Sequence, residues 1–198
     1  MKGNDMLDHY FPMEYEYSIP LKLSEVGKYS ISKPWLSKRI IQTMKQYIGP
    51  LEDKIITDST ANNGGDTLRF SKHFTLVNSI EIDKYEYEHL ENNVLSYKCN
   101  NVLLYLGDCK DIIPTLVQDI IYIDPPWGGE DYRNHKKLDL YLGNTLLLDF
   151  IRTLKSKCSH CVVKIPYNFN DEQFHTLGCK YHKIELTRTV YLLIICMV

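Results

Sequence analysis

The chain has 198 residues, of which 44% are apolar and 24% are charged, and its formal net charge is −2. This is the composition of a globular protein with one substantial core, and it excludes a protein that coats nucleic acid through bulk positive charge. No apolar stretch approaches the length that spans a bilayer, and the first residues do not form a signal peptide. We therefore expect an intracellular protein, cytoplasmic or nuclear, with no membrane partner.

The cysteines are predicted to be reduced thiols, because the chain can build a large core and shows no secretion signal. Four residues, Cys158, Cys161, Cys179 and His182, have the spacing of a Cys₃His zinc site. The alternative is that Cys161 begins a buried strand, where cysteine acts as a small apolar residue. We favour that alternative and predict no metal, since ligands on two successive strands do not readily converge on one ion.

The N-terminal part combines an irregular segment with a helix. Residues 1–30 are rich in aromatic side chains, including Tyr15 and Tyr17, and either cover the core or form a flap over a ligand cleft. Ser32 is the predicted N-cap of a helix with proline in its first turn, and Gly49 marks the helix end. We therefore expect a flap and lead-in helix over residues 1–50, packed on a main domain over residues 51–198.

A strand, a turn of small residues and a helix follow one another in residues 54–74. The strand is predicted over residues 54–59 and the helix over residues 68–74. The turn between them must let a ligand approach the backbone, which only small side chains allow. This order is typical of nucleotide-cofactor sites, and the candidate cofactor-binding residues in it are Asp58, Ala61, Asn63, Gly64, Gly65 and Thr67.

Acids also end the next two predicted strands. Residues 76–83 form a strand that carries Glu81 and Asp83 at its end, about 20 residues beyond the glycine turn, where a carboxylate suits the two hydroxyls of a ribose. We place Glu81 first and Asp83 second for that role. A helix over residues 85–97 leads to a third strand, which ends in Asp108 and Cys109.

The fourth predicted strand, residues 120–123, is apolar at every position, which is typical of a buried strand in a parallel sheet. It runs into Asp124, two prolines, Trp127 and two glycines. The prolines remove backbone donors and end the strand, so Asp124 and Trp127 are expected at the carboxyl edge, where open α/β sheets bind ligands. A flat ligand is the expected occupant of this loop.

The C-terminal part predicts a helix over residues 143–157, a strand over residues 161–165 and an adjacent pair of strands over residues 180–187 and 190–197. Strands and helices alternate until this final pair. The fold class is therefore α/β.

Three motifs resemble the trimethylguanosine synthase-like family, whose members methylate the N2 amine of guanine in an RNA cap. They are Pro125–Tyr132, Asp58–Thr67 and Pro166-x-Asn168, and the resemblance runs from about Gly27 to the C-terminus. The family has glycine where this chain has Asn62, the residue type that best tolerates a left-handed backbone after glycine. The resemblance implies a class I methyltransferase fold, with a seven-stranded, mostly parallel sheet and helices on both faces. It also implies S-adenosylmethionine (SAM) as cofactor, with Asp108 near its adenine amino group.

The resemblance further implies roles in methyl transfer. Asp124 and the Pro125 carbonyl would accept hydrogens from an exocyclic amine, whose lone pair is delocalised into the ring. Trp127 would stack on 7-methylguanine, whose positive charge favours an indole face. Further candidates for substrate binding are Asp131, Tyr132 and Asn168.

The predicted class is thus a SAM-dependent N-methyltransferase, acting as a monomer on capped RNA. Arg133, Lys136 and Lys137 either contact the cap phosphates or form a charged exposed loop. Because Asp124 stands where the family often has serine, methylation of adenine N6 in DNA or RNA is the alternative. A second alternative is a non-catalytic subunit of an RNA-modification complex. The abundance of Lys, Asn, Ile and Tyr would suit a large DNA virus.

Overall fold

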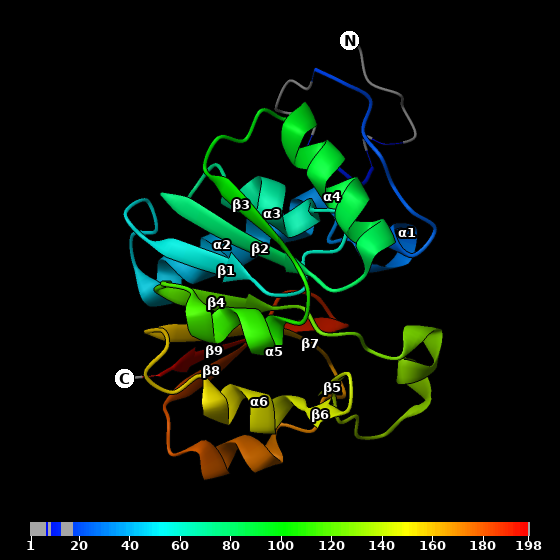
Figure 1. Cartoon of the computed structure of the whole chain (residues 1–198). Coiled ribbons are helices and arrows are strands. Elements are labelled where there is room, and N and C mark those ends of the chain that lie inside the picture. The colour runs from blue at the N-terminus through cyan, green and yellow to red at the C-terminus, as the bar shows by residue number, and fades with distance from the viewer. Residues whose placement is uncertain (1–6, 8, 13–17, 198) are drawn as a thin grey trace. The chain divides into compact units, whose positions relative to one another are not determined.

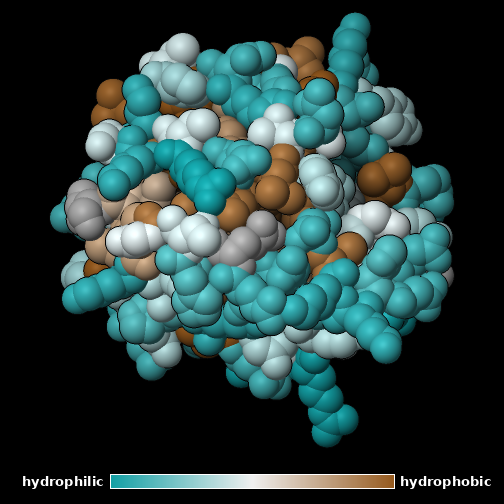
Figure 2. All heavy atoms as spheres, turned by 90° about the horizontal axis from the view of Figure 1, so that it is seen from below, coloured by the Kyte–Doolittle hydropathy of each residue, from teal (hydrophilic) through white to brown (hydrophobic). Residues whose placement is uncertain are grey.

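The computed structural model describes residue 7, residues 9–12 and residues 18–197 (Figure 1). Tyr15 and Tyr17 of the aromatic N-terminal segment lie outside these residues. The chain forms two compact units, unit 1 (Met1–Leu116) and unit 2 (Val117–Val198). The separate role predicted for residues 1–50 stays a prediction. On the face shown in Figure 2, most atoms belong to hydrophilic residues, with apolar atoms scattered among them.

Unit 1 contains three parallel strands, β1 (Ile55–Asp58), β2 (Leu76–Glu81) and β3 (Val102–Leu106). Its helices are α1 (Gly27–Ser30), α2 (Pro34–Ile48), α3 (Gly65–Phe70), α4 (Lys84–Ser96), α5 (Cys109–Ile112) and the 3₁₀ helix η1 (Ile113–Thr115). All three predicted strands are confirmed. Because parallel strands end at the same edge of a sheet, the acids at their ends share one edge of this unit.

Two predicted helix starts in unit 1 were wrong. α2 begins at Pro34 with Lys33 as N-cap and without a side-chain cap, because the Ser32 hydroxyl donates instead to Oδ2 of Asp66 at 2.6 Å. α3 begins three residues before the predicted start, since Gly64 turns the chain at a φ of 92° and lets the helix start at once. It also ends at Phe70, with turns rather than helix up to residue 74.

Unit 2 contains the parallel pair β4 (Ile120–Ile123) and β7 (His160–Pro166). β9 (Val190–Cys196) runs antiparallel to β7 and to β8 (Tyr181–Glu185), as predicted for the final pair. The remaining elements are the 3₁₀ helices η2 (Gly129–Asn134) and η3 (Glu172–Leu177), the strands β5 (Tyr141–Leu142) and β6 (Thr145–Leu146), and the helix α6 (Leu147–Thr153).

The helix predicted over residues 143–157 begins later and ends earlier than expected. Gly143 has a φ of 60° and turns the chain into the short antiparallel pair β5–β6, so α6 starts only at Leu147. A left-handed turn cannot be part of an α-helix, which explains why α6 starts later than predicted.

The seven main strands follow the order β3-β2-β1-β4-β7-β9-β8. Pairing is parallel among β1, β2 and β3 and between β4 and β7, and antiparallel at β9 and β8. The predicted seven-stranded, mostly parallel sheet is confirmed.

Part of the N-terminal segment belongs to the core of unit 1, whereas Ile19, Val26 and Tyr29 are exposed. Phe11 is fully buried, and together with Leu21 it packs in one apolar cluster with Leu90 of α4. The backbone N–H of Ser18 donates to the carbonyl of Ser96 at 2.9 Å, which ties the segment to the end of α4. Phe11 and Leu21 therefore pack in the core of unit 1, while the role of the segment as a whole stays a prediction.

Phe11→Ala is expected to lower the free energy of unfolding by about 3–5 kcal/mol, the range for loss of a fully buried phenyl ring. Urea denaturation followed by circular dichroism measures this. The control is Val26→Ala, which truncates a side chain that is 59% exposed and should cost less than about 0.5 kcal/mol. An equally small effect at Phe11 would show that the segment does not contribute to the core.

Candidate active site

The end of β1 is held by a buried hydroxyl. The Thr67 hydroxyl donates to Oδ2 of Asp58 at 2.6 Å and lies 2.8 Å from the Ser79 hydroxyl. Asp58 is buried and Thr67 is fully so, which means that Thr67 positions the carboxylate rather than facing a ligand. The backbone N–H of Ala61 donates to the carbonyl of Ile80, so the turn after β1 is fastened to β2.

The turn itself needs left-handed residues. Asn62 has a φ of 47° and Gly64 a φ of 92°, which confirms that asparagine supports the turn where the family has glycine. A Cβ on Gly64 would also lie 2.9 Å from a methyl carbon of Leu90, so a larger residue would push the turn away from α4. Gly65 follows as the first residue of α3.

Asn63 faces the protein interior instead of the edge of the sheet. Its side-chain oxygen accepts from the backbone N–H of Ser24 at 2.9 Å, and its side-chain N–H donates to Oε2 of Glu86 at 2.5 Å. The Ser24 hydroxyl donates to the same Glu86 oxygen at 2.6 Å. A Cβ on Gly27 would lie only 2.0 Å from the Asn63 side-chain oxygen. Only the backbone of Asn63 is therefore placed to meet a ligand.

Glu81 ends β2 with both carboxylate oxygens engaged by backbone. Oε2 accepts from the N–H of Asn62 at 2.7 Å and Oε1 accepts from the N–H of Asp83 at 2.9 Å. Burial raises the pKa of the Glu81 carboxyl, and these backbone donors partly oppose that rise. A carboxylate accepts about four hydrogen bonds, so the oxygens can still receive further donors. Beside it, the apolar side chain of Ile82 is 66% exposed.

The other two acids of this edge are helix caps. Oδ1 of Asp83 accepts from two N–H groups in the first turn of α4, at 2.8 and 3.1 Å. Oδ1 of Asp108 accepts from the N–H of Lys110 at 2.9 Å, and its Oδ2 lies 3.3 Å from that residue's Nζ. Cys109 is buried, and burial raises the pKa of its thiol to about 12. Asp83 and Asp108 are thus engaged as helix caps, and the role of Glu81 as the ribose ligand stays a prediction.

In unit 2, the residues after β4 form a loop shaped by glycines and aromatic contacts. Gly128 and Gly129 have φ values of 86° and 69°, a left-handed pair that only glycine adopts easily and that turns the chain into η2. The Trp127 ring then meets the Tyr132 ring edge to face, with centroids 5.2 Å apart and planes at 73°. The two predicted aromatic site residues therefore lie side by side.

Lys164 is a site residue that the sequence predictions missed. Its side chain is only 7% exposed, and its Nζ lies 2.5 Å from Oδ2 of Asp124 and 5.8 Å from the centroid of the Trp127 ring. β4 and β7 pair Ile123 with Val163. The residues that follow them, Asp124 and Lys164, therefore lie next to one another. A lone lysine in an otherwise apolar strand was the available signal, because a buried cation requires a partner.

Asn168 fastens the same loop from the end of β7. Its side-chain N–H groups donate to the carbonyls of Tyr132 and His135, both at 2.7 Å. Within the part of the chain that the structure describes, its buried side-chain oxygen has no hydrogen-bond partner, and neither has the buried Nε1 of Trp127. These two atoms are therefore one unpartnered acceptor and one unpartnered donor of this loop.

The charged residues near this loop differ in their surroundings. Asp131 is exposed and accepts a long hydrogen bond of 3.4 Å from Asn134. Lys137 pairs with Glu172 at 2.6 Å, whereas Lys136 is exposed. These groups form a charged, solvated surface, and a contact with phosphates stays a prediction.

The cysteine pattern behaves as apolar packing. Cys158 and Cys161 are buried, and burial raises the pKa of Cys158 to about 12 and that of Cys161 well above its usual value. Among the described residues there is no group of three or more His, Cys, Asp or Glu side chains that could hold a metal ion.

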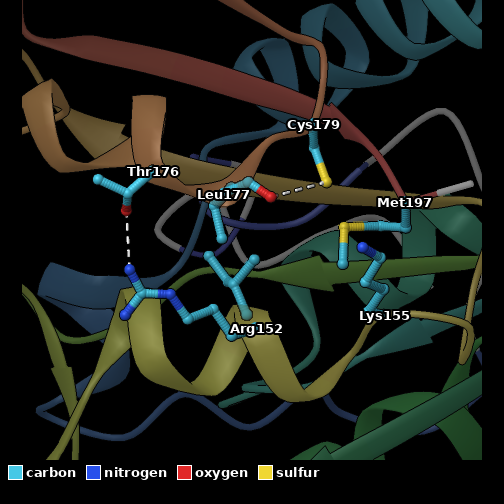
Figure 3. A pocket seen from close by; sticks show the side chains of 7 residues that line it. Arg152, Lys155, Thr176, Leu177, Cys179 and Met197 are labelled. Carbon is cyan, nitrogen blue, oxygen red and sulfur yellow. Dashed lines mark hydrogen bonds between the residues drawn. The ribbon is translucent and has the colours of Figure 1, made fainter.

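A hollow in unit 2 lies apart from every predicted site residue (Figure 3). Arg152 of α6 points toward Thr176 and donates to its hydroxyl at 2.7 Å, and the Cys179 thiol donates to the carbonyl of Leu177 at 3.6 Å. Its lining is Ile151, Arg152, Lys155, Thr176, Leu177, Cys179 and Met197. Apart from Lys155, the polar groups drawn there bind one another, and a single lysine is not a set of groups that converge on a ligand.

Known proteins resemble this chain in sequence and in fold. A family model described as RNA cap guanine-N2 methyltransferase matches residues 53–192. An uncharacterized protein of Acanthamoeba polyphaga mimivirus is 32% identical over 145 residues, which are 71% of this chain and 54% of that protein. The trimethylguanosine synthase of Schizosaccharomyces pombe is 23% identical over 171 residues, 82% of this chain and 70% of that protein. The chain thus spans about half the length of the viral relative.

Solved structures share the fold at low identity. A candidate RNA methyltransferase from Pyrococcus horikoshii gives a TM-score of 0.65 at 15% identity, over 91% of this chain and 93% of that one. A candidate methyltransferase from Streptococcus mutans, in complex with SAH, gives 0.59 at 13% identity, over 85% and 99%. At such identities the likeness shows the fold alone. In the described part of this chain, no helix is long and apolar enough to cross a membrane.

Strand order and these likenesses give the chain the fold of the class I methyltransferases. Within that class the chain belongs to the RNA cap guanine-N2 methyltransferase family, whose model covers most of its length. SAM is accordingly its cofactor.

Glu81→Ala is expected to weaken SAM binding by about 10- to 100-fold, because hydrogen bonds to a charged partner contribute about 1.5–3 kcal/mol. Isothermal titration calorimetry measures the Kd. Asp83→Ala is the matched control, since it removes a helix cap on the same edge and should cost about 1 kcal/mol of stability with little change in Kd. The reverse order of effects would make Asp83 the ribose ligand.

Asp124→Asn should destabilise unit 2 by about 3 kcal/mol, because it leaves the Lys164 ammonium buried without its carboxylate. Replacing both residues, as Asp124→Asn with Lys164→Met, should restore most of that loss. Urea denaturation of the two single variants and the double variant gives the coupling energy. Losses that simply add in the double variant would show that the two side chains act independently.

Proposed function

We propose that this protein transfers a methyl group from SAM to the exocyclic N2 amine of a 7-methylguanosine RNA cap. The observation that carries the proposal is the loop of Asp124 and Trp127, in which Lys164 fixes the carboxylate and lies over the indole. Membership of the cap guanine-N2 family supports this choice of acceptor.

The residues of unit 1 fit an adenosine cofactor. Glu81 presents a carboxylate at the end of β2 with capacity for two more hydrogen bonds, which matches a ribose diol. Ile82 offers an exposed apolar surface beside it for the adenine ring, and Asp108 is the acid for the adenine amino group. The backbone of the turn from Asn62 to Gly65 would meet the remainder of the molecule. When bound, SAM supplies an electrophilic methyl group on its sulfonium.

On the acceptor side, the task of the protein is to orient a weak nucleophile. The lone pair of an exocyclic amine is delocalised into the base, so a fixed acceptor on its hydrogens increases electron density at nitrogen as the new bond forms. Asp124 supplies that acceptor, and its carboxylate cannot swing away because Lys164 binds Oδ2 at 2.5 Å. The Pro125 carbonyl is the second acceptor on this rigid turn. The proton released from nitrogen then passes to Asp124 or to water.

Trp127 selects the base by stacking. A 7-methylguanine ring carries positive charge, and an indole face binds a cation more strongly than a neutral ring. Lys164 lies over one side of the indole, so the base would take the opposite face. The unpartnered side-chain oxygen of Asn168, which also holds Tyr132 in place, is available to accept a hydrogen bond from the substrate.

The alternative acceptor is the N6 amine of adenine, since the sequence Asp-Pro-Pro-Trp also occurs in adenine-N6 methyltransferases. That reaction needs the same carboxylate and the same stacking face. It does not need a cationic base, and this difference separates the two acceptors.

Transfer of labelled methyl from SAM is therefore measured on two short RNAs, one with a 7-methylguanosine cap and one with an unmethylated guanosine cap. Label on guanine N2 of the methylated cap alone is the expected result. Equal transfer to both RNAs with label on adenine N6 would establish the alternative. No transfer to either RNA, with SAM still bound, would indicate a non-catalytic subunit.

Trp127→Ala should lower kcat/KM on the methylated cap by about 100-fold, because the base loses the face that aligns it. The Kd for SAM should not change measurably, since the cofactor residues lie in unit 1. Trp127→Phe is the conservative control and should retain part of the activity. If Trp127→Ala instead unfolds the protein in a urea titration, the ring is a core residue and the stacking role is wrong.

A further inference from the structure

One stretch of the chain, residues 26–51, is rich in cationic side chains and has no acidic ones. Between Glu25 and Glu52 there is no Asp or Glu, whereas five cations fall within it, namely Lys28, Lys33, Lys38, Arg39 and Lys45. The whole chain has a net charge of −2, so this concentration of positive charge is local. It covers all of α1 and α2.

The residues of α2 fall on two faces of the helix, one buried and one exposed. Its buried face holds Leu36, Ser37, Ile40, Ile41, Thr43 and Met44. On the opposite face Trp35, Lys38, Arg39 and Gln42 follow the i, i+3, i+4, i+7 spacing of one helix side, and all four are exposed. The Trp35 indole is 56% exposed, so its ring is open to stacking on this face.

The cations of this stretch are not equivalent. Lys28 pairs with Glu25 and Lys45 pairs with Glu52, the two acids that flank the stretch. Lys38 and Arg39, in contrast, make no ion pair among the residues that the structure describes. Lys33 is only partly exposed, and its Nζ lies 3.9 Å from the centroid of the Tyr10 ring. Lys38 and Arg39, the two cations on the face of Trp35, are therefore the ones best exposed to an external anion.

The start of α2 is fastened to the cofactor turn. The Ser32 hydroxyl donates to Oδ2 of Asp66, the residue that follows the glycine pair, at 2.6 Å. Gly65 lies close to Ile31, the residue before Ser32. A Cβ on Gly65 would be 2.4 Å from a side-chain carbon of Ile31. The start of the helix that carries Trp35 is thus tied to the turn that is expected to hold the methyl donor.

We propose that the exposed face of α2, defined by Trp35, Lys38, Arg39 and Gln42, binds the RNA chain of the substrate. The inference rests on the proposed RNA substrate. It concerns a different surface from the loop of Asp124 and Trp127, which is proposed to bind the cap. A base stacks on Trp35 and the phosphates beside it are neutralised by Lys38 and Arg39, the combination by which proteins bind single strands without reading their sequence. Gln42 adds a hydrogen-bonding group one turn further along.

The test is fluorescence anisotropy of a labelled, uncapped 20-nucleotide RNA over a series of salt concentrations. Trp35→Ala should weaken binding by about tenfold. The pair Lys38→Ala with Arg39→Ala should weaken binding and reduce the slope of log K against log salt by about 1.4, since each phosphate contact on a single strand contributes about 0.7. The matched control removes two exposed cations of unit 2, Lys155 and Lys157, by alanine and should leave the slope unchanged.

Methyl transfer separates this inference from the proposed function. On a capped dinucleotide the α2 variants should keep the wild-type rate, whereas the advantage of a capped 20-nucleotide RNA in kcat/KM should disappear. Wild-type binding in the α2 variants, or a slope reduced equally by the control pair, would overturn the α2 surface while leaving the cap reaction intact. Failure of the wild-type protein to methylate any cap would overturn the proposed acceptor, and the anisotropy result would still decide the surface.

Discussion

The loop after β4, which carries Asp124 and Trp127, depends on the ion pair between Asp124 and Lys164. A lysine in the middle of an apolar strand is strongly unfavourable unless a carboxylate meets it. The parallel register of β4 and β7 places the two side chains on adjacent strands, where Nζ reaches Oδ2 at 2.5 Å. The same ammonium lies over the Trp127 ring. One buried side chain therefore fixes both the hydrogen-bond acceptor and the stacking surface, and neither member of the pair can be exchanged alone without leaving a buried charge.

The glycine turn of unit 1 is stabilised in a comparable way. Its Asn63 side chain points inward and binds Ser24 and Glu86, so that the N-terminal segment and α4 together hold the backbone that would meet SAM. Polar groups that bind one another behind a loop restrict its conformations, and a preorganised loop loses less entropy when a ligand binds. In both units the residues that would touch a ligand are held in place by polar side chains of a neighbouring element.

The sequence predicted the edge of the sheet well because its signals are local. A buried parallel strand is a run of apolar residues, and Glu81 and Asp124 stand where such runs stop. The tolerance of Asn62 for a left-handed φ was likewise a property of the residue itself. The wrong starts of α3 and α6 come from left-handed glycine turns, whereas two other failures concern partners distant in sequence. Ser32 was expected to cap a helix, but a buried acid in α3 takes its hydroxyl. Lys164 was predicted only as a residue of a strand. Once the register of β4 and β7 is known, its place beside Asp124, the residue that follows β4, can be inferred.

The same pair bears on which base is methylated. Serine, the residue that the family often has in place of Asp124, accepts and donates hydrogen bonds without charge and requires no buried cation. Aspartate at this largely buried position, with a side chain 18% exposed, adds a negative charge that Lys164 neutralises. The loop therefore has the same net charge as it would with serine and an apolar residue on β7, and the aspartate by itself is weak evidence for adenine as the acceptor. In the proposed cap reaction, discrimination in favour of a cationic 7-methylguanine would rest on the indole face of Trp127, because the carboxylate's charge is already balanced by the lysine.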